Sequence, residues 1–171
     1  MKRFFIIAFS FYLSGCVILN EDRVPCPKTA ILAEFSKSVD FHENTLIRTE
    51  MDSFRSSCTT ENNATLMNLR LRLTSFRPLS SFHSSQTLKV PFFIAIVESN
   101  GNLLSQSNQE LEVLFKENQT TKVNFLNLQE RIPAHKDVVV YAGFNLNEEQ
   151  LNLLEKEREK KYLIKDSNSL H

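Results

Sequence analysis

Few residues in this chain have the types and spacing that catalysis or metal binding requires. Histidine is a frequent general acid–base and metal ligand, and the four histidines are dispersed, without ligand neighbours at helical or strand spacing: His42, His83, His135 and His171. The sequence has no Gly-x-Ser-x-Gly elbow, phosphate-cradling glycine loop or His-Glu-x-x-His pair. Asp40 and His42 could form a base with its orienting carboxylate, but they lie in a polar connection with no nucleophile to nominate. We therefore predict no enzyme, no catalytic residue, no metal and no cofactor.

Cysteine supplies the remaining chemistry, and the first cysteine closes an export signal. Lys2 and Arg3 precede an apolar stretch over 4–12, which ends in Leu13-Ser14-Gly15-Cys16. A charged start, an apolar stretch of roughly 7–15 residues and small residues at its end are typical of a secretory signal peptide. The tetrapeptide resembles the lipobox of bacterial lipoproteins, which implies that 1–15 is removed and that Cys16 carries lipid such as palmitate. The alternative is an ordinary cleaved signal whose cysteine is incidental.

The lipobox resemblance implies a lasting membrane anchor. Each buried methylene contributes about 0.8 kcal/mol and one acyl chain binds only reversibly, so two or three chains on Cys16 hold the protein on the bilayer. In lipoproteins of this kind an Asp after the cysteine commonly retains the protein at the inner membrane, so Val17 favours the outer membrane. We therefore expect a cell-envelope protein that faces the periplasm, with 16–27 as a lipidated tether.

Charge limits the possible partners. The chain has 20 basic and 20 acidic residues, and loss of Lys2 and Arg3 leaves 18 basic against 20 acidic. Nucleic-acid binding requires a clustered basic face, and a polybasic segment would be needed to reinforce lipid contact. We expect neither, so the predicted partners are the membrane, through Cys16, and another envelope protein.

The other two cysteines, Cys26 and Cys58, predict a disulfide. The periplasm is oxidising, and an even pair of cysteines in an exported domain is typical of a bridge. Segments 30–35 and 47–57 have strand-like patterns and are separated by a polar connection over 36–44. If they pair antiparallel, Cys26 lies opposite Cys58 and the bridge joins neighbouring strands. The alternatives are two free thiols or a pair of metal ligands.

Short segments with period-two alternation predict an all-β fold. Seven strands are expected, over 30–35, 47–57, 65–76, 89–98, 110–116, 121–126 and 137–144. The residues expected to face the core are Leu69, Leu71, Leu73, Leu111, Val113, Phe115, Val123 and Phe125. Segment 89–98 is apolar on both faces, which predicts a central strand; because proline donates no ladder hydrogen bond, Pro91 should lie at its start, an edge or a bulge. We predict an antiparallel β-sandwich over 28–146, with immunoglobulin-like topology as the best guess.

The period then changes, which predicts a helix within the last segment, 147–171. Asn147 can cap it, with Gln150 three residues on and Leu146 placed to pack on Leu151. Leu151 and Leu154 form a short apolar stripe that should dock on the sandwich. The highly charged stretch 155–161 is then either a solvated helix end or an arm that meets a partner.

Charged residues at outward strand positions form one candidate partner surface. They are Arg48, Arg70, Arg72, Glu110 and Glu112. Opposite charges that face each other across strands contribute roughly 0.2–1 kcal/mol per pair, so simple cross-strand pairing is the alternative.

The mature chain also resembles small lipoproteins of alphaproteobacterial envelopes, on the strength of Cys26-Pro27, of 91–97 and of 143–151. That resemblance supplies no activity to carry over. We expect a non-catalytic binding or scaffolding role first. A carrier or chaperone for an apolar ligand comes second, with a cavity lined by residues such as Phe92, Phe125 and Phe144. A hydrolase of envelope polymers comes last.

Overall fold

The protein is represented by a computed structural model that describes residues 26–42, 45–61, 64–81, 83–133 and 137–168. The predicted signal peptide, Cys16 and most of the predicted tether lie outside these residues, as do His135 and His171. The side chains of His42, Glu61 and residues 160–168 are likewise not described.

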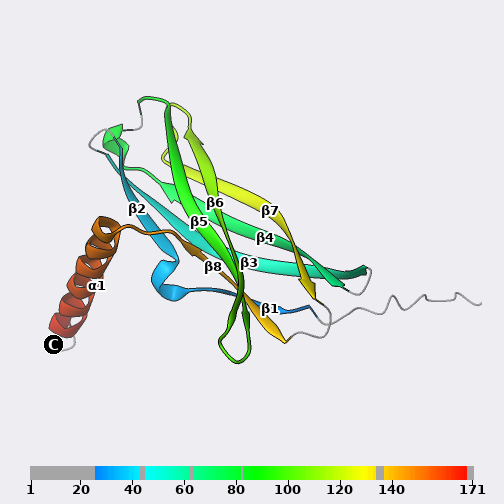
Figure 1. Cartoon of the computed structure of the whole chain (residues 1–171). Helices are drawn as coiled ribbons and strands as arrows, with labels where there is room; N and C mark the ends of the chain where they lie inside the picture. The colour runs from blue at the N-terminus through cyan, green and yellow to red at the C-terminus, as the bar shows by residue number, and fades with distance from the viewer. Residues whose placement is uncertain (1–25, 43–44, 62–63, 82, 134–136, 169–171) are drawn as a thin grey trace, which may run out of the picture.

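The described residues form a β-sandwich of two four-stranded sheets (Figure 1). The first, here called the β5 sheet, has the order β1 (Lys28–Ile31), β8 (Val138–Phe144), β5 (Gln86–Glu98) and β6 (Leu103–Phe115). The second, the β4 sheet, has the order β2 (Lys37–His42), β3 (Thr45–Glu61), β4 (Ala64–Phe76) and β7 (Thr121–Pro133). The prediction of an all-β sandwich followed by a helix is confirmed.

Three details of the predicted topology are wrong. Segment 30–35 is not one strand, because β1 ends at Ile31 and a 3-10 helix, η1 (Ala33–Phe35), carries the chain across to the other sheet. The connection predicted over 36–44 contains strand β2, which pairs antiparallel with β3, and β1 pairs in parallel with β8. A constant-type immunoglobulin domain places its first, second, fifth and fourth strands in one sheet, so the order found here differs from it.

The core lies between the two sheets and is built by strict alternation. The predicted core residues of β4 and β6 are buried: Leu69, Leu71, Leu73, Leu111, Val113 and Phe115. The predictions for β7 are wrong, because Val123 and Phe125 are 39% and 52% exposed. Residues paired in register share a face of the sheet, and Phe125 is paired with the outward Arg72, whereas Leu126 is paired with the buried Leu71.

Strand β5 is central, as its apolar sequence predicts, with β8 on one side and β6 on the other. Pro91 pairs with Glu110 of β6, but pairing with β8 begins only at Phe92. At Pro91 the β8 side is occupied instead by the Asn145 N–H, which donates to the Pro91 carbonyl oxygen at 3.0 Å. The proline therefore sits where β5 has a strand on one side only, and its missing donor removes no ladder bond on the β8 side.

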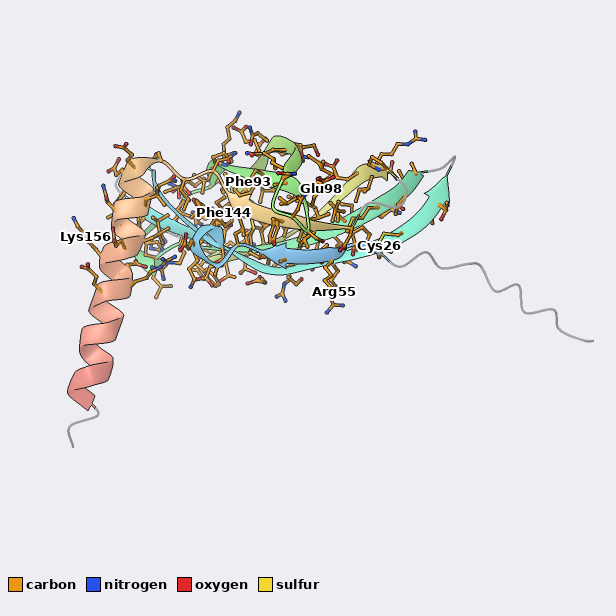
Figure 2. The ribbon with its side chains drawn as sticks, turned by 60° about the horizontal axis from the view of Figure 1, so that its bottom comes forward. Cys26, Arg55, Phe93, Glu98, Phe144 and Lys156 are labelled. Atoms are coloured by element: carbon orange, nitrogen blue, oxygen red, sulfur yellow. A yellow bond between two sulfur atoms is a disulfide. The ribbon has the colours of Figure 1, made fainter. Side chains whose placement is uncertain are left out.

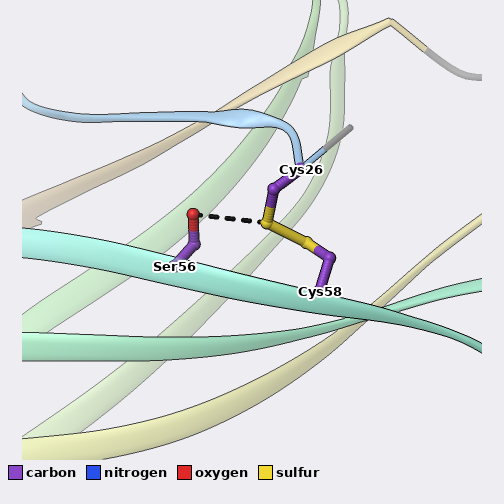
Figure 3. Close-up of a disulfide and its surroundings, with 3 residues drawn as sticks. All are labelled: Cys26, Ser56 and Cys58. Carbon is purple, nitrogen blue, oxygen red and sulfur yellow. Dashed lines mark hydrogen bonds between the residues drawn. A yellow bond between two sulfur atoms is a disulfide. The ribbon is translucent and has the colours of Figure 1, made fainter. Parts of the chain in front are cut away.

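The predicted disulfide is present, but it does not join neighbouring strands. Cys26 and Cys58 are bonded with their Cα atoms 5.4 Å apart (Figure 3). Cys26 lies two residues before β1 of the β5 sheet, whereas Cys58 lies in β3 of the β4 sheet, so the bridge ties the two sheets together. The Ser56 hydroxyl lies 3.4 Å from the Cys26 sulfur and can donate to it.

Helix α1 (Glu148–Asn168) begins with the predicted capping box. The Gln150 N–H donates to Asn147 Oδ1 and the Asn147 N–H donates to Gln150 Oε1, each at 2.9 Å. Leu154 is 6% exposed and docks the helix, but Leu151 is 41% exposed, so the docking stripe is Leu154 with the buried Gln150. The far end of the helix points away from the sandwich (Figures 1 and 2).

Candidate functional site

The five charged residues predicted to form one partner surface do not lie together. Arg70 and Arg72 are on the outer face of the β4 sheet, whereas Glu110 and Glu112 are exposed on β6, on the outer face of the β5 sheet. Glu110 forms an ion pair with Lys89 at 2.9 Å. The pKa of Lys89 is raised, first by its hydrogen bond to Glu110 and second by the negative charge of Glu110. Arg48 forms an ion pair with Glu157 of α1.

An open groove of about 510 Å³ lies on the outer face of the β4 sheet. Its outward side chains come from two cross-strand rows, one of Arg55, Arg70 and Asn127 and the next of Ser57, Asn68 and Gln129. A second hollow of about 240 Å³ continues the groove along the neighbouring row, which contains Ser53, Arg72 and Phe125. We call this surface the arginine groove.

The arginine groove holds two arginines at directly opposed positions of neighbouring strands. Arg55 of β3 is paired in register with Arg70 of β4, and like charges directly opposite each other destabilise a sheet. Among the described side chains, no carboxylate lies within 4.0 Å of either guanidinium, whereas Arg72 binds Asp52 at 3.6 Å. Figure 2 shows Arg55 pointing away from the ribbon.

Phe125 fixes the second of these two arginines. The Arg70 guanidinium carbon lies 4.7 Å from the centroid of the Phe125 ring, a cation–π contact worth about 0.5–1 kcal/mol at an exposed site. This contact explains an aromatic ring on an outer face. Arg70 and Arg55 both line the groove, so each can donate hydrogen bonds to a ligand there.

A β-bulge in β3 determines which of its residues line the groove. Met51 is paired with Leu73 and Ser53 with Arg72, so Asp52 is an extra residue with no partner in the ladder. Beyond the bulge the outward positions become 53, 55 and 57 instead of 52, 54 and 56. Asp52 accepts a hydrogen bond from the Thr74 hydroxyl and forms an ion pair with Arg72, so the bulge also supplies the only carboxylate described beside the groove.

Sequence reasoning found Arg70 and Arg72 but missed Arg55, Asn127 and Gln129. Arg55 follows the bulge, which no periodic pattern indicates. Asn127 and Gln129 lie in the second half of β7, beyond the point at which that strand was predicted to end. Apolar residues alternate again at Leu126, Leu128 and Ile132, one register later than Val123 and Phe125, and this resumed alternation is the signal that would have extended the strand.

A second polar cluster holds the start of α1 against β2. Asp40 accepts hydrogen bonds from Ser38 Oγ and Gln150 Nε2, each at 2.8 Å. Burial raises the pKa of the Asp40 carboxyl, and the two hydrogen bonds oppose that rise. Because its donors are a capping residue and its own strand neighbour, we assign this cluster to helix docking and not to chemistry.

Arg77 is a third polar centre that the sequence did not reveal. It is 4% exposed, stacks 5.1 Å from the centroid of Phe115, and donates to the carbonyl oxygens of Gln119, Ser84 and Lys116 at 2.6–2.7 Å. One buried side chain therefore ties together the connection after β4 and the β6–β7 turn. The hydrogen-bond acceptors described for it are backbone carbonyl oxygens, so we assign it a structural role.

Within the described part of the chain, no group of three or more His, Cys, Asp or Glu residues is arranged to hold a metal ion. None of the described helices is both long and apolar enough to span a membrane. No protein-family model, curated protein or solved structure matches this chain. The fold and the groove therefore define the site on their own: a β-sandwich with a cationic, amide-rich face.

Proposed function

We propose that this chain is a lipid-anchored protein of the bacterial cell envelope with a non-catalytic binding role. It is held by lipid on Cys16, faces the periplasm, preferably from the outer membrane, and presents the arginine groove to its partner. The observation that carries the binding role is the Arg55–Arg70 pair: two like charges placed opposite each other, with no described carboxylate to balance them. Such a pair costs stability in the free protein and is balanced when an anionic group binds between the two guanidiniums.

The proposed anchor places the groove near the membrane. Cys16 and Cys26 are ten positions apart, which corresponds to about 33 Å of fully extended chain. Cys26 is bonded to Cys58, and the neighbouring Ser57 lines the groove. The groove thus lies close to Cys26, and Figure 2 shows Arg55 near that residue.

The geometry favours this role over carriage of an apolar ligand. A carrier was expected to enclose a cavity lined by Phe92, Phe125 and Phe144. Phe92 and Phe144 are fully buried between the sheets, whereas Phe125 lies on the outer face beneath Arg70. The three rings therefore do not surround a common space.

A photo-crosslinking experiment in intact cells tests the proposed binding face. A photoreactive residue is placed at Asn127, in the groove, and in a matched variant at Gln106, which is exposed on the outer face of β6. We expect a crosslinked product from position 127 that is lost when Arg55→Gln and Arg70→Gln are added, and none from position 106. Two outcomes would contradict the proposal. One is an equal yield of crosslinked product at the two positions, and the other is a product at position 127 whose yield is unchanged when the two arginines are replaced.

A further inference from the structure

We infer that the arginine groove binds a strand of anionic polysaccharide, with a carboxylate or phosphate of the sugar chain held between Arg55 and Arg70. This inference rests on the proposed binding role and names the class of ligand. Three features of the groove carry it: its net charge, its place in the middle of a sheet, and the amides beside the arginines.

The charge of the face selects an anionic ligand. In the four successive cross-strand rows from Ser53 to Thr59, the outward residues of β3, β4 and β7 include the arginines at positions 55, 70, 72 and 131 and no acidic residue. The bulged Asp52 beside them is already bound by Thr74 and Arg72. The whole chain has no net charge, so this concentration of one sign is local. A guanidinium binds carboxylate or phosphate through two parallel hydrogen bonds.

The position of the groove argues against an extended acidic peptide. Peptides that bind to sheets usually add a strand at a free edge, where backbone N–H and C=O groups are unpaired. The floor of this groove is β4, which is hydrogen-bonded to β3 on one side and to β7 on the other. Recognition must therefore come from side chains, and a peptide backbone would find no backbone partner here.

The length of the groove suits a polymer chain. The hollow of about 510 Å³ is open to solvent, and a second of about 240 Å³ continues it along the neighbouring cross-strand row. A single polymer chain can lie along the groove across successive rows.

The amides complement the hydroxyl groups of sugars. Asn68, Asn127 and Gln129 each present a donor and an acceptor side by side, as each sugar hydroxyl does. Gln129 Nε2 donates to Asn68 Oδ1 at 3.0 Å, which orients both side chains and leaves the Gln129 oxygen and the Asn68 amide nitrogen to a ligand. An anion site flanked by oriented amides fits a charged sugar next to further sugar rings.

The test measures binding of short oligomers to the detergent-solubilised protein by calorimetry. The probes are a galacturonic acid hexamer, a glutamic acid hexamer of the same charge, and neutral maltohexaose. We expect the galacturonate hexamer to bind at least tenfold more tightly than either other probe, and its affinity to fall as salt is raised. Arg55→Gln with Arg70→Gln should weaken that binding at least tenfold, while Lys89→Gln with Lys116→Gln, which removes the same charge elsewhere, should change it less than threefold.

Asn127→Ala keeps every charge and separates sugar recognition from simple attraction. It should weaken galacturonate binding at least threefold and leave glutamate binding unchanged. Glutamate binding as tightly as galacturonate, or no binding of either acid, overturns the inference about the ligand. The proposed function does not fall with it, because that is judged by the crosslinks at position 127.

Discussion

Replacing both bridging cysteines by serine should destabilise the domain by about 3.7 kcal/mol at 25 °C. The bridged residues are 32 apart in sequence. In the loop-entropy relation, a closed loop of that length removes about 12 cal/mol/K from the unfolded chain, which gives that free energy at 298 K. The loss is a large fraction of the 5–15 kcal/mol of a typical domain. It corresponds to a fall in melting temperature of about 10 °C for a protein of this size.

Loss of the disulfide should destabilise strand β1 first. This strand has four residues, lies at the edge of the β5 sheet and pairs there with β8 alone, and the Thr29 hydroxyl also donates to the Phe54 carbonyl oxygen of β3 at 3.2 Å. The bridge from Cys26 to Cys58 is the covalent link that holds it over β3. Without the bridge, amide hydrogens of β1 should exchange faster than those of the central strands β4 and β5.

Urea denaturation followed by circular dichroism measures the effect, with and without reductant. Oxidised parent protein should lose about 3.7 kcal/mol on reduction, while the double serine variant should not respond to reductant. Ser56→Ala is the matched control, because it removes the hydroxyl beside Cys26 and leaves the bridge intact. A double serine variant within about 1 kcal/mol of the oxidised parent would refute the reasoning, since the loop-entropy term is several times larger.

Three further predictions concern the polar centres. Arg77→Leu should cost about 3 kcal/mol in urea denaturation, because it removes three hydrogen bonds from one buried charged side chain to carbonyl oxygens of two connections. Arg131→Leu, at an exposed position, should stay within about 0.5 kcal/mol, and equal losses for the two variants would contradict the assignment. Asn147→Ala should cost about 1 kcal/mol and reduce helical circular dichroism, since it removes the cap on the Gln150 N–H; undiminished helix signal would count against it. Burial raises the pKa of Asp40, so its contribution to stability is complete below pH 3.8 and is lost as pH rises through the folded-state pKa. The Asp40→Asn variant should therefore gain stability relative to the parent as pH rises. A difference in unfolding free energy that does not change with pH would contradict a raised pKa of the Asp40 carboxyl.

Local patterns in the sequence were sufficient where one rule acted without competition. The leucines of β4 alternate without interruption, and their burial follows from that alone. The capping box needs only Asn147 and Gln150 three positions apart. The pairing of Cys26 with Cys58 followed from their number and the expected compartment.

The errors came where placement depends on a distant strand. The β2 sequence is polar because Ser38 and Asp40 face helix α1, so it resembles a loop until the helix is in place. The sheet to which β1 belongs is decided by β8, which lies more than a hundred residues away. The arginine groove needed the bulge at Asp52, which leaves no periodic signal, and the full length of β7, whose apolar alternation changes register between Phe125 and Leu126.

Mass spectrometry of the intact protein, extracted from the membranes of cells that make it, tests most directly the claim that this domain is tethered by lipid. The account predicts a chain that begins at Cys16 and carries a diacylglyceryl group on its sulfur, with or without a further acyl chain on its amine. A chain that still begins at Met1, or one that begins at Cys16 with an unmodified thiol, would contradict it.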